Sequence, residues 1–121
     1  MKIKITVGNN ALTATMYENA TSRCFIKKLP LSLPMMDLYS REMVYRFREA
    51  LPAEEALTRG YEVGEIIYYP PLHSFVIMYA QNKEVFYMQS MGRIDSNVQV
   101  FDGIGDVDVT FEMVNVTGIG K

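Results

Sequence analysis

Arg46 and Arg48 are the side chains of this chain whose type and spacing best suit binding chemistry. They alternate with Tyr45 and Phe47, and this period of two predicts a strand that carries both arginines on one face. A guanidinium fixed on a strand can donate to a backbone carbonyl or a carboxylate that lies in a surface groove. The competing interpretation is an ordinary solvated strand face.

The other reactive side chains are isolated. His73 is the only histidine and Cys24 the only cysteine, so we expect neither a zinc site nor an internal disulfide. Lys27 and Lys28 lie close to Cys24, but no base accompanies it, and an inert, buried thiol is the preferred interpretation. The run 102–108 is rich in aspartate but lacks the ligand order of an EF-hand. We therefore expect no metal and no cofactor.

Composition narrows the class of protein. A chain of 121 residues with 49% hydrophobic and 21% charged residues predicts one folded domain. Its net charge of −2 provides no basic surface for a nucleic acid. No apolar run is long enough to cross a bilayer or to form a signal peptide. The expectation is a cytoplasmic protein with no membrane partner, as a monomer or a weak homo-oligomer.

Alternating apolar residues predict mainly β structure. We expect a hairpin over 2–16 with its turn at 8–10, and a short helix over 20–28 that Asn19 or Thr21 caps. Further strands are expected at 31–35 (an edge strand), 43–48, 64–69, 74–79, 85–88 and 107–113, with a short turn at 98–101 and irregular chain at 49–60.

The runs Ile66–Tyr69 and Phe75–Tyr79 flank a Pro-Pro corner and are apolar without alternation, as in strands buried on both faces. About eight strands with frequent turns predict an antiparallel barrel or sandwich, and the barrel is preferred because closure removes the sheet edges. The domain is expected to span 1–116, with a flexible tail at 117–121.

Three segments carry a family resemblance over residues 2–112. They are the helix that ends in Leu29-Pro30-Leu31, the hairpin Gly64–Tyr79, and Met91-Gly92-Arg93-Ile94. In this order they resemble the small bacterial cyclophilin-like proteins, and the last segment is similar to the Gly-Lys-Val turn of true cyclophilins. The resemblance implies a closed antiparallel cyclophilin-like β-barrel with one or two short helices.

True cyclophilins are prolyl cis/trans isomerases, with an arginine on a barrel strand beside an apolar pocket and a Gln, a Trp and a His at its rim. By this resemblance Arg46 matches the arginine, and Ser74–Met78 matches the strand that bears the pocket phenylalanine. The Phe-x-Gln-Gly-Gly-Asp segment is replaced by Arg48–Pro52, tryptophan is absent, and His73 lies in the Pro-Pro corner.

The sequence therefore favours a binding domain without efficient catalysis, which presents a groove to a peptide or a small ligand. Arg46 would be the polar anchor, and Tyr45, Tyr69 and Phe75 would be the apolar walls. One alternative is a prolyl isomerase with an altered rim, in which Arg46 is the catalytic residue. Another is an assembly role through strand edges, with no small ligand.

Overall fold

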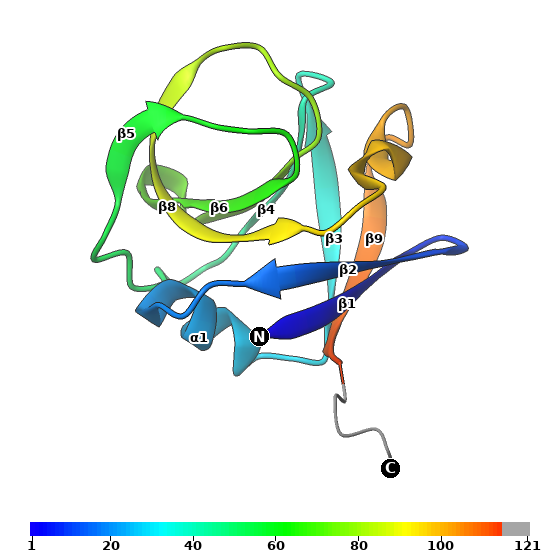
Figure 1. Cartoon of the computed structure of the whole chain (residues 1–121), viewed down its shortest axis with the longest axis horizontal. Helices are drawn as coiled ribbons and strands as arrows, with labels where there is room; N and C mark the ends of the chain where they lie inside the picture. Colours follow the sequence, from blue (N-terminus) through cyan, green and yellow to red (C-terminus); the bar gives the residue numbers. More distant parts are fainter. Residues whose placement is uncertain (115–121) are drawn as a thin grey trace.

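The computed structural model describes residues 1–114 of the chain (Figure 1). The expected end of the domain at 116 and the expected tail at 117–121 lie outside these residues. The elements are, in chain order, β1 (Lys2–Val7), β2 (Asn10–Met16), α1 (Ala20–Ile26), β3 (Leu31–Leu38), β4 (Glu42–Arg46), β5 (Leu57–Gly60), β6 (Glu65–Tyr69), the 3-10 turn η1 (Pro70–Leu72), β7 (Ser74–Met78), β8 (Val85–Ile94), the 3-10 turn η2 (Val98–Phe101) and β9 (Val107–Met113).

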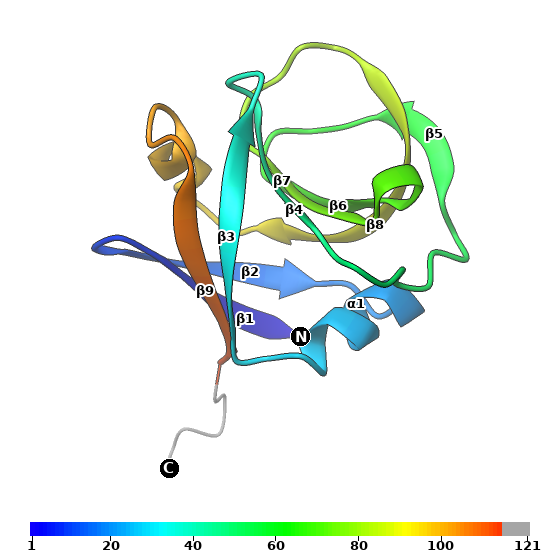
Figure 2. The ribbon, with the colours of Figure 1, turned by 180° about the vertical axis from the view of Figure 1, so that it is seen from behind.

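The strands form a closed antiparallel barrel, as the sequence predicts. Their order is β2-β1-β9-β3-β4-β7-β6-β8, and β2 pairs with β8 to complete the ring. The short strand β5 pairs only with the first half of β8, outside the ring (Figures 1 and 2). Strands β1 and β9 are neighbours, and the N–H of Val114 donates to the carbonyl of Lys2 at 3.2 Å.

The ring closes where β8 crosses β2. Gly92 lies opposite Met16 of β2 and Ile66 of β6, next to a register shift between Ile66 and Ile67. Just after β8, the carboxylate of Asp95 accepts hydrogen bonds from Lys2 Nζ at 2.6 Å and from the hydroxyls of Thr13 and Thr15 of β2. These bonds outweigh the effect of partial burial and hold the pKa of Asp95 below its usual range, so its charge stabilises the closed seam.

Helix α1 supplies an aromatic anchor to the barrel core. Asn19 caps the helix, since its side-chain oxygen accepts from the N–H of Ser22 at 2.9 Å, as predicted. Phe25 is fully buried, stacks on Phe75 with a centroid distance of 4.4 Å, and meets Phe111 edge-on at 5.6 Å. A seven-residue helix is too short to be stable alone, so this packing holds it in place. No helix among residues 1–114 has the length and apolarity of a membrane span.

Strands β6 and β7 are buried on both faces, as their apolar runs predict, and β4 lies beside β7 in the same wall. Their inner face contributes Met43, Phe75, Ile77 and Tyr68 to the main core. The outer face of the wall belongs to a second cluster, to which the first half of β8 and Tyr61 also contribute, made of Val44, Tyr61, Ile67, Val76, Met78 and Met88. The barrel wall is therefore shared between two apolar clusters, and this arrangement positions the candidate site.

Three local predictions are wrong. Strand β3 is not an edge, because it pairs with β9 on one side and with β4 on the other. The segment 49–60 was expected to be irregular but contains β5. The segment Met91–Ile94 lies within β8 rather than in a turn, since the ladders to β6 and β2 extend the strand to Ile94. All three errors concern pairing with distant strands.

Gly92→Ala tests the closure. A Cβ at this position would meet the carbonyl oxygen of Thr15 and lie 2.9 Å from Met16 Sδ and 3.0 Å from Met16 Cα. We expect the free energy of unfolding to fall by about 3 kcal/mol, because backbone cannot yield to the added methyl. Urea denaturation followed by circular dichroism measures this. Gly60→Ala is the matched control, since its nearest neighbour is 3.9 Å away; equal losses in both variants would refute the close-crossing argument.

Candidate ligand groove

A groove of about 200 Å³ lies on the outer face of β4, β7 and β6. The strand register places Val44, Val76 and Ile67 side by side across the three strands, and Met78 follows on β7. These side chains belong to the outer apolar cluster and form the floor of the groove, and Phe86 of β8 contributes to its lining. Hydrophobic floors of this kind accept apolar groups from a ligand.

One end of the groove carries Arg46. The register places Arg46 beside Ser74, and Ser74 beside Tyr69, on the same face as the apolar floor. Leu72 of η1 completes this end. Arg46 is exposed, and within residues 1–114 its guanidinium makes no ion pair and no side-chain hydrogen bond. Its donors are therefore available to a ligand.

The opposite end is built around Arg41, which is 6% exposed. The β3–β4 turn has Tyr39 and Ser40 at its centre with φ of 58° and 49°, and Arg41 N–H closes it on the Leu38 carbonyl at 3.1 Å. Both central residues are in the left-handed region without being glycine, which is costly for tyrosine. The ring of Tyr39, 78% exposed, lies over the Arg41 guanidinium at 5.0 Å.

Two carboxylates and a second ring fix Arg41. Its Nε and Nη2 donate to Glu42 Oε2 at 2.7 and 2.5 Å, and its Nη1 donates to Glu84 Oε1 at 2.7 Å. The ring of Phe86 lies on the guanidinium at 5.0 Å. Burial opposes the charge, but the bonds to Glu42 and then to Glu84 prevail and raise the pKa of Arg41. The guanidinium is therefore a permanently charged, stacked part of the groove end.

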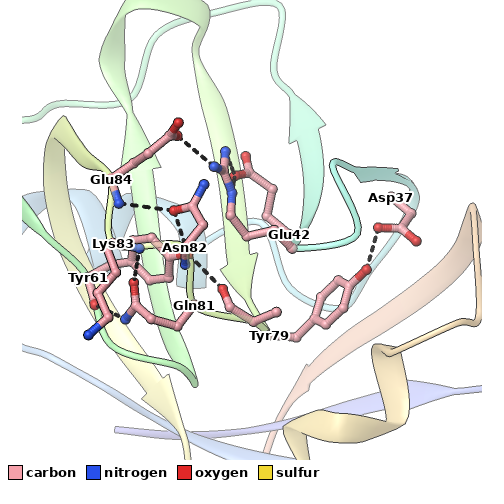
Figure 3. Close-up of polar contacts among 10 residues, drawn as sticks. Asp37, Glu42, Tyr61, Tyr79, Gln81, Asn82, Lys83 and Glu84 are labelled. Carbon is pink, nitrogen blue, oxygen red and sulfur yellow. Dashed lines mark hydrogen bonds and ion pairs between the residues drawn. The ribbon is translucent and has the colours of Figure 1, made fainter.

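The loop that presents Glu84 is ordered by its own side chains (Figure 3). Asn82 Oδ1 accepts from the N–H of Glu84 at 3.0 Å, and Gln81 Nε2 donates to the carbonyl of Tyr61 at 2.8 Å. The hydroxyl of Tyr61 donates to the carbonyl of Ala80 at 2.7 Å and accepts from the N–H of Asn82. Hydrogen bonds from Asn82 and Arg41 keep the pKa of Glu84 below its usual value. The Arg41–Glu84 pair thus joins two pre-ordered segments.

Figure 3 also shows a buried pair beside this loop: the hydroxyl of Tyr79 donates to Asp37 at 2.6 Å. Burial and this bond raise the pKa of Tyr79, so the phenol stays neutral. A second, polar hollow is lined by Arg59, Glu65 and Tyr17. There the Glu65 carboxylate is already engaged by Arg59 and by the N–H of Glu62, so the pair is a structural link. The described part of the chain holds no cluster of metal ligands.

Comparison with known proteins identifies the family. The model of the Cyclophilin-like family matches residues 5–112. The chain belongs to this family. Its barrel is also similar to the solution structure of the hypothetical protein AF2241 from Archaeoglobus fulgidus, with a TM-score of 0.72 and 17% identity over 94% of this chain and 95% of that one. That likeness concerns the fold alone. No curated protein matches the sequence.

This cyclophilin-like barrel separates the four residues expected to form one site. Arg46 and Tyr69 line the groove. Phe75 has no exposed surface and stacks on Phe25 in the core, so it cannot be a wall of the groove. Tyr45 also faces inward, where it meets Phe47 edge-on at 5.0 Å. The reason is the alternation of side chains along a strand: Tyr45 comes one position before Arg46 and so faces the opposite side, and Phe75 pairs with Tyr45.

The far end of the groove was not predicted from the sequence; it is lined by Tyr39, Arg41, Glu42 and Phe86. The sequence does carry one signal for this end. Two apolar strands flank a short polar interval, and this pattern predicts the β3–β4 hairpin. The other candidates lie elsewhere: His73 is in the turn after η1, Cys24 packs beside the core, and Arg48 lies beyond the end of β4, outside the groove lining.

Arg41→Met tests how much the ion pairs at the Arg41 end of the groove contribute to stability. It leaves the Glu42 carboxylate, whose side chain is 12% exposed, without its donors. We expect the free energy of unfolding to fall by about 3 kcal/mol, as for a buried pair that loses one member. Guanidinium chloride denaturation at constant ionic strength measures it.

The matched control is Glu84→Gln, which removes the exposed partner, with a side chain 59% exposed. Its unfolding midpoint should shift only slightly, since exposed ion pairs contribute little. A larger loss for Glu84→Gln than for Arg41→Met would mean that the loop, and not the buried pair, holds this end together.

Proposed function

We propose that this protein is a binding domain without efficient catalysis, and that its groove takes a small ligand or peptide with an apolar body and a carbonyl or carboxylate oxygen at Arg46. The observation that carries the proposal is the Arg46 guanidinium, which has no side-chain partner within residues 1–114, at the end of the apolar floor. A charge-assisted bond to the ligand oxygen would fix orientation, and the floor would supply apolar contact.

The chemistry of the lining supports binding over reaction. The groove has no cysteine or histidine among its lining residues, and its serine, Ser74, donates to the carbonyl of Leu72 at 3.1 Å and to no side-chain base among residues 1–114. Arg46 can donate and Tyr69 can offer a hydroxyl, but neither is an activated nucleophile.

A small probe with one carboxylate and one apolar ring tests the proposal. We expect 4-phenylbutyrate to bind to the wild type and to move the amide resonances of β4, β6 and β7 in a heteronuclear NMR titration. Arg46→Ala should weaken binding about tenfold or more, because a charge-assisted hydrogen bond is lost.

Arg48→Ala is the matched control for that titration. It removes an equally exposed arginine two residues away, outside the groove lining, and should leave the affinity unchanged. Equal weakening in both variants would mean that the affinity depends on the net charge of the protein and not on a contact with Arg46. Absence of binding, together with a mass above 13.8 kDa in size-exclusion chromatography, would favour the assembly role instead.

Prolyl isomerisation is the second candidate, favoured by the place of Arg46 on a strand of a cyclophilin-like barrel beside an apolar floor. We expect no acceleration of cis/trans exchange in an X-Pro peptide, since Phe75 faces the core and leaves no phenylalanine wall on β7 next to Arg46. NMR exchange spectroscopy with and without the protein measures the rate. An acceleration that disappears in Arg46→Ala would make the protein an isomerase and locate its site.

A further inference from the structure

The two ends of the groove carry opposite charge. Arg46 supplies a positive charge at one end, with no counter-ion in the described chain. At the other end, Arg41 lies between the carboxylates of Glu42 and Glu84, so this end is net negative when the carboxylates are ionised. A ligand that matches the groove is therefore a dipolar molecule, anionic toward Arg46 and cationic toward Glu42.

Glu42 has an acceptor left for such a cation. Both of its bonds to Arg41 end on Oε2, and Oε1 accepts no hydrogen bond from residues 1–114. The side chain is only 12% exposed, and the residue lines the groove. A largely buried carboxylate oxygen without a donor costs free energy that a ligand N–H would recover.

The strand sets the distance between the two ends. Glu42 and Arg46 are the first and last residues of β4 and lie on the same face of it. Their Cα atoms are therefore about 13 Å apart, at about 3.3 Å for each residue of a strand. An extended tripeptide spans about 10 Å between its termini. The long side chain of Arg46 reaches the remaining distance.

The floor limits the size of the occupant. A volume of about 200 Å³ is smaller than the roughly 300–1,000 Å³ of pockets that enclose drug-sized ligands. It has room for one apolar side chain over Val44 and Val76, with the ligand backbone above. A groove of this size holds one side chain rather than the length of a long peptide, and this favours a short free molecule.

We infer that the groove takes a free tripeptide with an apolar middle residue, its C-terminal carboxylate on Arg46 and its N-terminal ammonium on Glu42. The inference rests on the proposed function, because it uses the same groove and the same anchor. It adds the second anchor, Glu42, the length of the ligand and its direction. An internal segment of a folded chain has neither terminal charge and would not satisfy both ends.

Changes made to the peptide test the inference with the protein unaltered. Isothermal titration calorimetry compares Ala-Leu-Ala with its N-acetyl form, its C-terminal amide and the form blocked at both ends. We expect the free tripeptide to bind most tightly, and each block to weaken binding about tenfold, since each removes one charge-assisted contact.

Two protein variants test which terminus of the peptide each residue binds. In Arg46→Gln the acid and the amide should bind alike, whereas acetylation should still weaken binding. In Glu42→Gln the free and acetylated forms should bind alike, whereas amidation should still weaken binding; Arg48→Gln should behave as the wild type. If Glu42→Gln fails to fold, the four peptides on the wild type and on Arg46→Gln still decide the inference.

The outcomes separate the inference from the proposed function. Equal affinity for the free and doubly blocked peptides would overturn the inference and leave the groove proposal in place. So would tight, Arg46-dependent binding of 4-phenylbutyrate with no binding of any peptide. If neither probe binds, both fail. If acetylation rather than amidation loses its effect in Arg46→Gln, the direction of the ligand is refuted.

Discussion

Strand β8 takes part in three ladders, and the rest of the structure depends on the close crossing at Gly92 that makes this possible. There β8 passes against Met16 of β2 while it still pairs with β6, and the ring closes. The first half of the same strand leaves the ring, pairs with β5 and lies over the second apolar cluster. One strand thus closes the barrel and covers part of its outside. The groove lies on the outer wall beside this cover, and Phe86 of β8 is part of its lining.

The wall made of β4, β7 and β6 contributes both to the hydrophobic core and to the candidate site. Its inner side chains complete the aromatic core around Phe25 and Phe75, whereas its outer side chains form the floor of the groove. A strand so apolar on both faces needs cover on both. At the far end of the groove the cover is a charged group, the guanidinium of Arg41. The cost of burying its charge is offset by the carboxylates of Glu42 and Glu84 and by two aromatic rings.

The sequence predicts those parts of the fold that depend on local periodicity. Alternation predicts the first hairpin, β4 and β9, the unbroken apolar runs predict the burial of β6 and β7 on both faces, and Asn19 predicts the start of the helix. It does not predict β5, because that strand is short, largely exposed and held only by pairing with β8. For the site, the periodicity that places Arg46 on a face also requires Tyr45 to lie on the other, whereas the position of Phe75 needed the β4–β7 register. Tyr39 and Ser40 replace the usual Asn-Gly of a tight hairpin, so the turn and the Arg41 end beside it escape recognition.

The hydrogen bond between Val114 and Lys2 places the beginning and the end of the described chain side by side. With β9 beside β1, a short connection from residue 114 to residue 2 would turn the polypeptide into a near-continuous loop. The chain could then be cut in the exposed Gly8-Asn9 turn with every ladder preserved. Circular permutants of this kind would place both ends at the β1–β2 turn, which contributes no residue to the groove lining, so a fused reporter there would leave the ligand site open.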